Sequence, residues 1–348
     1  MDKPIKRLPN GAPSALSMNS FLITGIEKED PLSRWNGKHG TDVYSGAKID
    51  ALLADILLRH TVHTKDPINS ILQQESIDAQ RIRLCLSYIA GGLSCIFYLL
   101  NTNHPTCRQA NCLNEYDWEF WSKAKRVFLV GRLVEGQAGA YIESEITRQL
   151  VRLGTQTLRV SCFENSVTPS LIGCASSSYP LEPIFVFDFG ASMAKSGIAH
   201  NGRNGYQIEE LSQQKTPQIK NATHSKEDAE LLHRYILNVI LSTVEKQAYQ
   251  KPIRTISVSM CIANNIFDGK ISDRGFFAPL RRLAPSYFQY LKNDLEHCFH
   301  CPVALSIQND AEAVTHLFTE YAPYAAAITL GTAMGIAYPK AKGKFYNR

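Results

Sequence analysis

An acidic residue followed by small residues is the pattern in this sequence that points most directly to chemistry. Asp188 ends the apolar run 184–187 and is followed, after one residue, by Gly190, Ala191 and Ser192. A carboxylate at the end of a buried strand is costly unless it meets a cation or hydrogen-bond donors. A turn of small residues lets backbone N–H groups approach a phosphate, and Mg²⁺ in proteins keeps much of its water. The pattern predicts a phosphate-binding turn in which Asp188 holds Mg²⁺ through water, with an ordinary hairpin as the alternative.

A second acidic residue stands between an expected strand and an expected helix. Asn309 and Asp310 follow the apolar run 303–307 and precede the helical pattern 311–321. In α/β sheets, ligands bind at the carboxyl ends of the strands, so Asp310 is a candidate general base. The alternative is that Asp310 only caps the helix that follows.

Two more turns of small residues come directly after apolar runs. Gly331 and Thr332 follow the run 325–330 and again suit contact with a phosphate. Gly131 follows the run 126–130, where the end of a strand could hold a nucleotide base or ribose. The sequence therefore spreads its candidate site residues over four strand ends.

The elements that must position these residues are indicated by apolar runs and helical periodicity. The first half reads as helices and strands in the order α, β, α, β, α, with 101–115 as an irregular connection and a Pro-containing linker at 179–183. The second half opens with three consecutive strands, which differs from the alternation of a Rossmann fold. The expected strands are 126–130, 158–163, 184–188, 195–200, 206–211, 255–262, 303–307 and 325–330, with a hairpin of 336–338 and 344–346. The expected helices are 48–60, 80–100, 118–125, 138–153, 171–178, 225–247, 285–298 and 311–321.

The composition is that of a folded protein rather than of a disordered or fibrous chain. The 348 residues include 37 Lys and Arg against 32 Asp and Glu, a formal net charge of +5, and the basic residues are scattered. We therefore expect no nucleic-acid partner. The uncharged stretch 84–100 has 17 residues and a centre of small side chains, which we interpret as a buried core helix and not a membrane span. Without an apolar leader, nine cysteines indicate free thiols and a cytoplasmic location.

Three of these segments together resemble the ROK family, which belongs to the sugar kinase, actin and Hsp70 ATPase superfamily. The segment 188–192 stands where that family has Asp-Ile-Gly-Gly-Thr, and Gly197 falls on the glycine of its second strand. The segment 309–311 matches Asn-Asp-Ala, and 331–335 resembles Gly-Thr-Gly-Ile-Gly. The resemblance implies an ATP-dependent phosphotransferase in which Asp310 deprotonates a sugar-like hydroxyl. It also implies that the two turns hold ATP phosphates and Mg²⁺.

The order of these segments differs from that of the family. The second phosphate turn lies near the end of the chain, and segments similar to the family's adenosine side precede the first turn. The resemblance therefore implies an α/β fold of two actin-like, ribonuclease H-like lobes with a central cleft, joined in permuted order. We expect residues 1–182 to form the adenosine-side lobe, with Gly131 near the adenosine. Residues 183–348 would form the lobe with the phosphate motifs and Asp310.

Several departures from the family leave other functions open. The zinc-binding cysteines are absent from 36–41, so we expect no structural zinc, and the Glu-x-Gly-His sugar clamp is missing. The family's Gly-Pro-Val turn is replaced by 262–266, where Asn264 and Asn265 join Asn309 as candidate substrate-binding residues. Ala191 replaces a glycine of the first turn. The alternatives are a non-catalytic nucleotide- or protein-binding relative, a pseudokinase, and a nucleotide hydrolase without a sugar substrate. We expect a small-molecule substrate and no membrane partner, and a homodimer stays open.

Overall fold

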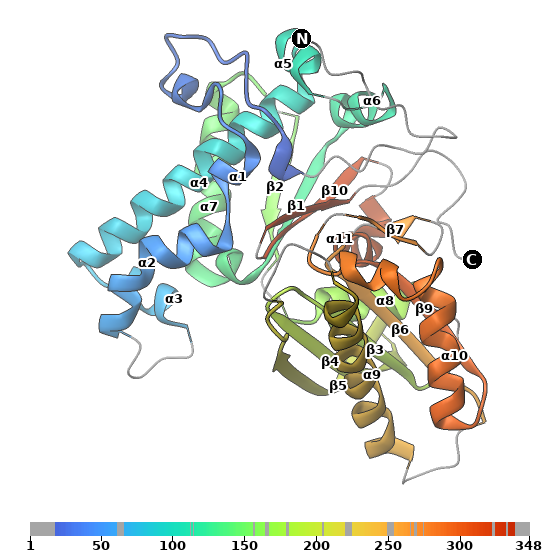
Figure 1. Cartoon of the computed structure of the whole chain (residues 1–348). Helices are drawn as coiled ribbons and strands as arrows, with labels where there is room; N and C mark the ends of the chain where they lie inside the picture. The colour runs from blue at the N-terminus through green and yellow to red at the C-terminus, as the bar shows by residue number, and fades with distance from the viewer. Residues whose placement is uncertain are drawn as a thin grey trace. The chain divides into compact units, whose positions relative to one another are not determined.

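The structure is a computed structural model, and its element order is shown in Figure 1. Thr332, Asn265 and the expected strand at 344–346 lie outside the residues that it describes. The described residues are 18–60, 66–111, 113, 115–155, 157–163, 167–178, 181–203, 205–219, 225–248, 254–264, 266–267, 270–273, 275–321, 324–331 and 333–337.

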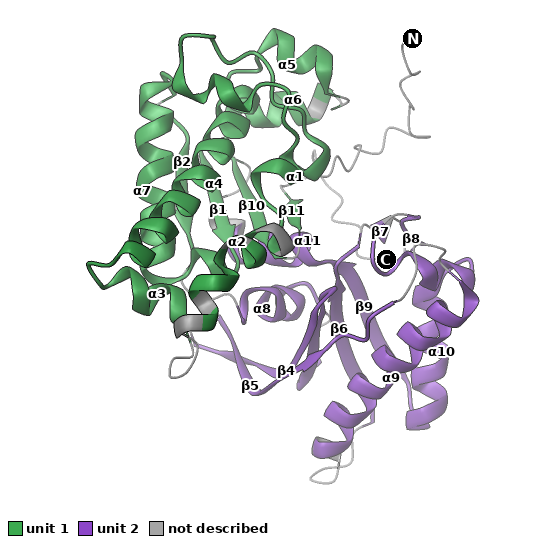
Figure 2. Ribbon diagram, turned by 60° about the vertical axis from the view of Figure 1, so that its left-hand side comes forward, with its two compact units in different colours: residues 1–166, 320–342 green, residues 167–319, 343–348 purple. Residues whose placement is uncertain are grey.

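The chain folds into two compact units, each assembled from two stretches of sequence (Figure 2). Unit 1 comprises residues 1–166 and 320–342, and unit 2 comprises 167–319 and 343–348. These limits differ from the expected boundary between 182 and 183. The difference arises because helix α8 (Pro169–Ser176) packs on the strands of unit 2, while strand β10 (Ala325–Leu330) pairs with a strand of unit 1.

Unit 2 contains a five-stranded sheet in the order β5-β4-β3-β6-β9 within the described residues. β3, β4 and β5 form an antiparallel meander, and β6 and β9 run parallel to β3. The three consecutive strands expected from the sequence are thus confirmed, and the protein is of the mixed α/β class. The strands are β3 (Ile184–Phe189), β4 (Met193–Gly202), β5 (Gly205–Lys215), β6 (Ile256–Ile262) and β9 (Val303–Asn309), with a small hairpin of β7 (Ile266–Phe267) and β8 (Lys270–Ile271).

Helices cover both faces of this sheet, and the alternation of β3 decides which side chain meets which helix. Phe185, Phe187 and Phe189 join the core that includes residues of α9 and α10, whereas Ile184 and Val186 join a smaller core with residues of α8. The side chain of Asp188 lies on the same face of β3 as those of Ile184 and Val186, which is the face covered by α8. The remaining helices of unit 2 are α9 (Lys226–Ala248), η5 (Ala278–Arg282), α10 (Tyr287–Phe299) and α11 (Asp310–Thr315), followed by η6 (His316–Tyr321).

Two residues hold the start of α9. The Ser225 hydroxyl accepts a hydrogen bond from the Asp228 N–H at 3.1 Å, and the Asp228 carboxylate accepts one from the Ser225 N–H at 3.2 Å. This reciprocal pair of hydrogen bonds is a capping box, which holds the first turn of the helix.

Unit 1 contains a four-stranded sheet in the order β11-β10-β1-β2 within the described residues. β10 comes from the end of the chain, yet it lies between β11 and β1 and runs parallel to β1. The strand expected at 126–130 forms with those limits, and so does the strand at 325–330. The bounds are β1 (Arg126–Val130), β2 (Arg159–Cys162) and β11 (Met334–Ala337).

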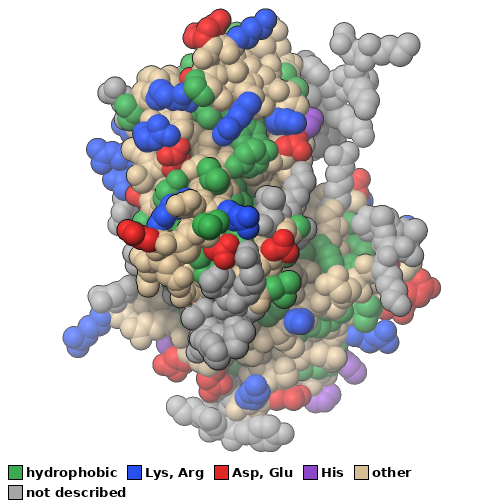
Figure 3. All heavy atoms as spheres, turned by 90° about the vertical axis from the view of Figure 1, so that its left-hand side faces the viewer, with side chains coloured by type: hydrophobic (Ala, Val, Ile, Leu, Met, Phe, Trp, Pro, Cys, Tyr) green, Lys and Arg blue, Asp and Glu red, His purple; other side chains and the backbone are tan. Residues whose placement is uncertain are grey.

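Helix α4 (Ile77–Asn101) is the central helix of unit 1. It is long and apolar enough to cross a membrane, and 67% of its most apolar window is buried inside the protein. Its outward side nevertheless carries Ile77 and Leu84, each 71% exposed. On the face of unit 1 that is at the left of Figure 1, hydrophobic side chains lie among Lys and Arg side chains (Figure 3).

The region 101–115 is more regular than expected. Helix α5 (Pro105–Ala110) forms there, with Pro105 in its first turn, where a missing N–H costs nothing. The other helices of unit 1 are η2 (Met18–Ser20), η3 (Pro31–Trp35), α1 (Gly40–Val43), α2 (Gly46–His60), α3 (Pro67–Leu72), α6 (Glu115–Lys123), η4 (Arg132–Val134) and α7 (Gly136–Arg152).

Candidate functional site

The Asp188 carboxylate is surrounded by side chains from three other elements of unit 2. The Ser170 hydroxyl donates to Oδ2 at 2.7 Å, the Lys195 ammonium lies 3.4 Å from Oδ2, and the Cys261 thiol donates to Oδ1 at 3.5 Å. Lys195 and Cys261 are its direct cross-strand neighbours on β4 and β6. Asp188 is only 8% exposed. These partners satisfy the demand of a buried carboxylate for a cation and donors.

Sequence reasoning missed Lys195, although the hairpin carried a signal for it. The turn at 190–192 pairs Asp188 with Lys195 in the β3–β4 ladder, so both side chains point to the same face of the sheet. The Lys195 side chain is 22% exposed to solvent. A cation that is partly open to solvent beside a buried carboxylate can also meet the negative charge of a phosphate.

The fit of Mg²⁺ to this site depends on the same contacts. Both oxygens of Asp188 already have partners, and one lies beside the ammonium of Lys195. Among the described residues, no group of three or more His, Cys, Asp or Glu side chains is placed to hold a metal ion. The donors present therefore fit a cation that is held through water and phosphate oxygens, and not one bound directly by several carboxylates.

Asp310 lies where β9 ends and α11 begins. The cap of α11 is Asn309, whose side-chain oxygen accepts hydrogen bonds from the N–H groups of Ala311 and Glu312 at 3.0 and 3.2 Å. The alternative that Asp310 is the helix cap is therefore wrong. Its Oδ1 accepts hydrogen bonds from the Ala311 N–H and from the Asn309 amide, both at 2.9 Å.

Burial, and then the negative charge of Asp188, raise the pKa of Asp310 to about 7. At that pKa the carboxyl group exchanges its proton readily near neutral pH, which suits a general base.

The position of Asp310 is fixed by a close approach of two helices. A Cβ on Gly173 of α8 would lie 1.8 Å from the carbonyl oxygen of Ala313 in α11, so only glycine allows this packing.

The two acidic residues belong to one edge of the sheet. The register pairs Asp188 with Cys261 and Cys261 with Gln308, so these side chains form a row across three parallel strands. Asp310 follows Gln308 by two residues. Burial raises the pKa of the Cys261 thiol, and a hydrogen bond with Cys174 and the nearby carboxylates raise it further. Cys261 therefore stays a neutral donor to Asp188 and is not an activated nucleophile.

The turn after β3 accommodates Ala191 without strain. Neither Gly190 nor Ala191, both of which the structure describes, has a positive φ. The Thr216 hydroxyl donates to the carbonyl of Gly190 at 2.7 Å, and the Thr216 N–H donates to that of Ser192 at 3.0 Å. Replacing the family's second glycine by Ala191 thus leaves the turn formed.

Asn264 is held beside Asn309 and offers a donor. Its backbone carbonyl accepts a hydrogen bond from the Asn309 amide at 3.0 Å. The residue is 6% exposed, and its Nδ2 is buried without a hydrogen-bond partner in the described structure. Such a group usually has a partner, so a bound molecule with an acceptor oxygen would fit here.

In unit 1 the structure brings Gly131 and the turn after β10 together. Gly131 has φ +149°, and a Cβ on it would lie 2.3 Å from the carbonyl oxygen of Leu330. The Gly331 carbonyl accepts a hydrogen bond from the Tyr44 hydroxyl at 2.8 Å. Among the described residues, a Cβ on Gly331 would meet the Ala333 oxygen at 3.9 Å, which is an ordinary van der Waals contact. Sequence reasoning missed Tyr44, which is 287 residues away along the chain.

The candidate residues therefore fall into two sets. Unit 2 brings together the acidic pair with Lys195, the turn and the asparagines, and unit 1 brings together the two glycine turns. The unit 2 set is Asp188, Gly190, Ala191, Ser192, Asn264, Asn309 and Asp310, and the unit 1 set is Gly131 and Gly331.

Comparison with known proteins adds little to this geometry. No protein-family model and no curated protein matches the chain. Among solved structures, the chain is similar to an exopolyphosphatase-like protein at 8% sequence identity. The match covers 69% of this chain and 87% of that one, with a TM-score of 0.30. A TM-score this low carries no argument for fold or chemistry, so the class of the protein, mixed α/β with two compact units, rests on its own topology.

Proposed function

We propose that the protein transfers a phosphoryl group from ATP to a hydroxyl of a small, sugar-like molecule. The observation that carries this proposal is the Asp310 carboxyl, whose pKa is raised to about 7 at the carboxyl edge of the unit 2 sheet. A carboxyl with this pKa is half deprotonated at neutral pH and can take the proton of an attacking hydroxyl. A positioned base of this kind contributes about 10²–10⁴-fold to a rate.

The surroundings of Asp310 supply the other parts that phosphoryl transfer needs. Lys195 puts a positive charge beside Asp188, and the turn at 190–192 offers backbone groups. Asn264 carries a buried amide that has no hydrogen-bond partner among the described residues. In this proposal Lys195 and the turn meet phosphate oxygens, and Asn264 and Asn309 orient the acceptor. Mg²⁺ bound through water near Asp188 would neutralise the phosphate charge.

The strand order supports the proposal that the two units are ribonuclease H-like lobes in permuted order. In unit 2, the sheet order β4-β3-β6-β9 places an antiparallel hairpin strand beside three parallel strands. Unit 1 repeats this arrangement as β11-β10-β1-β2. In unit 2 the hairpin precedes the parallel strands along the chain, whereas in unit 1 it follows them. A circular permutation would produce this difference, and termini at the surface of a domain tolerate one.

The repeated arrangement also relates the two glycine turns of unit 1 to nucleotide binding. Gly331 follows the strand that corresponds to β3, and Gly131 follows the next parallel strand, β1. In this proposal Gly331 and Thr332 contact phosphate and Gly131 lies near the adenosine. The close approach of Gly131 to the Leu330 carbonyl, directly before Gly331, supports the placing of both turns at one site.

Hydrolysis of a nucleotide by the same base is the second candidate. It is favoured by the absence of the Glu-x-Gly-His sugar clamp from the sequence, because a water molecule needs no clamp. A pseudokinase that binds nucleotide without turnover would use the same turns.

The experiment is a thermal shift with ATP and Mg²⁺, followed by assays of phosphate release and of transfer to a panel of sugars and polyols. We expect a nucleotide-dependent shift, and Asp310→Asn should keep the shift and abolish turnover. Glu296→Gln removes a carboxylate on α10, away from the site residues, and should behave like the wild type. No shift with ATP would refute the proposal, and turnover by Asp310→Asn would refute the assignment of the base. Binding without transfer or hydrolysis would favour the pseudokinase.

A further inference from the structure

Thr216 is a buried polar residue at the end of an exposed edge strand. It directly follows β5, whose side chains are exposed or half-buried throughout, yet it is itself only 3% exposed. Pro217 comes next and favours extended backbone at Thr216. A buried hydroxyl usually has a hydrogen-bond partner. The partner of this one lies 26 positions earlier in the chain, in the turn after β3.

Thr216 holds that turn at two of its carbonyl groups. Its hydroxyl donates to the Gly190 carbonyl at 2.7 Å, and its N–H donates to the Ser192 carbonyl at 3.0 Å. On the β4 side, the Gly190 N–H donates to the Met193 carbonyl at 3.0 Å. The turn at 190–192 is therefore fixed by a residue that the sequence places far from it.

The hydrogen bond to Gly190 also sets the direction of the next N–H group. A trans peptide is planar, so its carbonyl oxygen and its N–H point in opposite directions. Because the Gly190 carbonyl points toward the Thr216 hydroxyl, the Ala191 N–H points away from Thr216. That N–H donates no hydrogen bond to any residue that the structure describes, and Ala191 is partly exposed. The turn thus offers a backbone donor on the side opposite Thr216.

We propose that Thr216 is a positioning residue of the phosphate turn. Its hydroxyl holds the Gly190 carbonyl, so that the Ala191 N–H meets a phosphate oxygen of ATP. Without the hydroxyl, this peptide can rotate and turn its carbonyl oxygen toward the phosphate, which repels it, whereas N–H groups attract anions. The role of Thr216 depends on the proposed phosphoryl transfer, because it needs a phosphate at the turn. A purely structural role would affect stability and leave nucleotide affinity unchanged.

The test compares variants of the full chain by calorimetric titration with ATP and Mg²⁺ and by thermal denaturation. Thr216→Val keeps the shape of the side chain and the backbone N–H but removes the hydroxyl. We expect it to bind ATP about tenfold more weakly, as for the loss of one hydrogen bond to a charged group. Thr216→Ser keeps the hydroxyl and should bind like the wild type. Thr216→Ala removes the same hydroxyl and should repeat the loss, which covers the case that Thr216→Val does not fold.

A second buried threonine of unit 2 supplies the matched control. Thr243 is 9% exposed, and its hydroxyl donates to the Val239 carbonyl at 2.8 Å within α9. Thr243→Val therefore makes the same chemical change outside the candidate site. It should lower Tm and leave the affinity for ATP unchanged.

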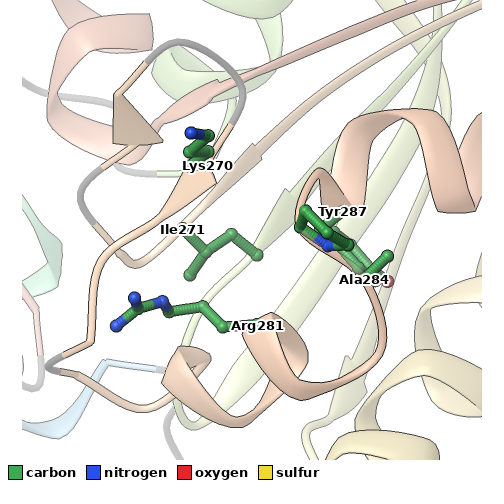
Figure 4. Close-up of a pocket in the computed structure, with 6 residues that line it drawn as sticks. Lys270, Ile271, Arg281, Ala284 and Tyr287 are labelled. Atoms are coloured by element: carbon green, nitrogen blue, oxygen red, sulfur yellow. The ribbon is translucent and has the colours of Figure 1, made fainter.

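Another control concerns phosphate binding elsewhere in unit 2. Figure 4 shows a pocket beside the start of α10, and its described lining residues include Arg281 and Tyr287 but no candidate site residue. Arg281→Gln should bind ATP like the wild type. Weaker binding by Arg281→Gln, together with unchanged binding by Thr216→Val, would place the phosphates at that pocket and overturn the proposal.

The remaining outcomes separate this role from the proposed function. If the wild type binds ATP and Thr216→Val binds it equally well, the role of Thr216 is refuted while the proposed function stands. Equal weakening in Thr216→Ser or in Thr243→Val also overturns the role, because the contact of the hydroxyl with the turn would not be the cause. If the wild type binds no ATP, the proposed function is refuted and the role of Thr216 with it.

Discussion

The ammonium of Lys195 lies 3.4 Å from Oδ2 of Asp188, directly across the β3–β4 pair. The carboxylate is 8% exposed, and a hydroxyl and a thiol complete its surroundings. The ion pair therefore has two consequences. It compensates the charge of a buried acid, and it leaves a partly exposed cation at the edge of the sheet where Asp310 begins a helix.

Replacing Lys195 by Met should lower the free energy of unfolding by about 1–3 kcal/mol. This is below the usual cost of breaking a fully buried pair, because Lys195 keeps part of its exposure. Urea denaturation measures the change. The double variant Asp188→Asn/Lys195→Met should be less destabilised than the sum of the two single variants, since it leaves no unpaired charge. Simple additivity would show that the pair contributes nothing.

The rate of any reaction that uses Asp310 as base should rise with pH and level off above about 7, because the carboxyl must be deprotonated. A pH profile of kcat at saturating ATP measures this. The control variant Glu296→Gln should have the same profile. A rate that is flat between pH 5 and 8, at constant nucleotide binding, would contradict the role of Asp310.

The same pKa predicts how stability depends on pH. The pKa of Asp310 is raised from 3.8 to about 7 in the folded protein, so the folded state holds a proton that the unfolded state has already lost. This contribution to stability is fully present below pH 3.8 and is lost as pH rises to about 7. Asp310→Asn should remove that dependence and be more stable than the wild type above pH 7, on the order of 1–2 kcal/mol after allowance for its partial exposure. Urea denaturation at pH 5 and 8 compares the two proteins.

Local patterns were enough to predict much of the fold. The apolar runs that became β1 and β10 ended where the strands end, because Gly131 and Gly331 follow them. The helical pattern expected over 225–247 matches α9 to within one residue at each end. Such signals act between residues a few positions apart, so the sequence displays them directly.

The rest depended on contacts between distant residues. The Tyr44 hydroxyl meets Gly331 from 287 positions away, and Ser170 meets Asp188 because α8 packs on the sheet of unit 2. The spacing of residues in the sequence predicts neither contact. Asp310 was predicted as a base from its neighbours, but its raised pKa needs the burial that only the folded sheet provides.

Asn309 has two roles that substitutions can separate. Its side-chain oxygen caps α11, and its amide donates to Asp310 and to the Asn264 carbonyl. Asn309→Ala should cost about 1–2 kcal/mol in the free energy of unfolding through loss of the cap. Asn309→Asp keeps a good capping oxygen and loses the donor, so it should retain most of the stability while turnover falls. Equal loss of stability in both variants, measured by urea denaturation, would show that the cap is not the main contribution.

Gly131→Ala should be strongly destabilising, and a second glycine separates the two reasons. At Gly131 the backbone has φ +149°, and a Cβ would lie 2.3 Å from the carbonyl oxygen of Leu330. Gly154 also has a positive φ, +87°, but among the described residues a Cβ there would meet nothing within 4 Å. Gly154→Ala should therefore cost only the backbone strain, about 1 kcal/mol, while Gly131→Ala should cost about 2–4 kcal/mol because the ends of β1 and β10 must also move apart. If thermal and urea denaturation gave equal losses for the two variants, the close approach of these strand ends would not be what requires glycine. If Gly131→Ala lost stability without weakening ATP binding in the residual folded protein, the position of Gly131 beside the nucleotide would be refuted.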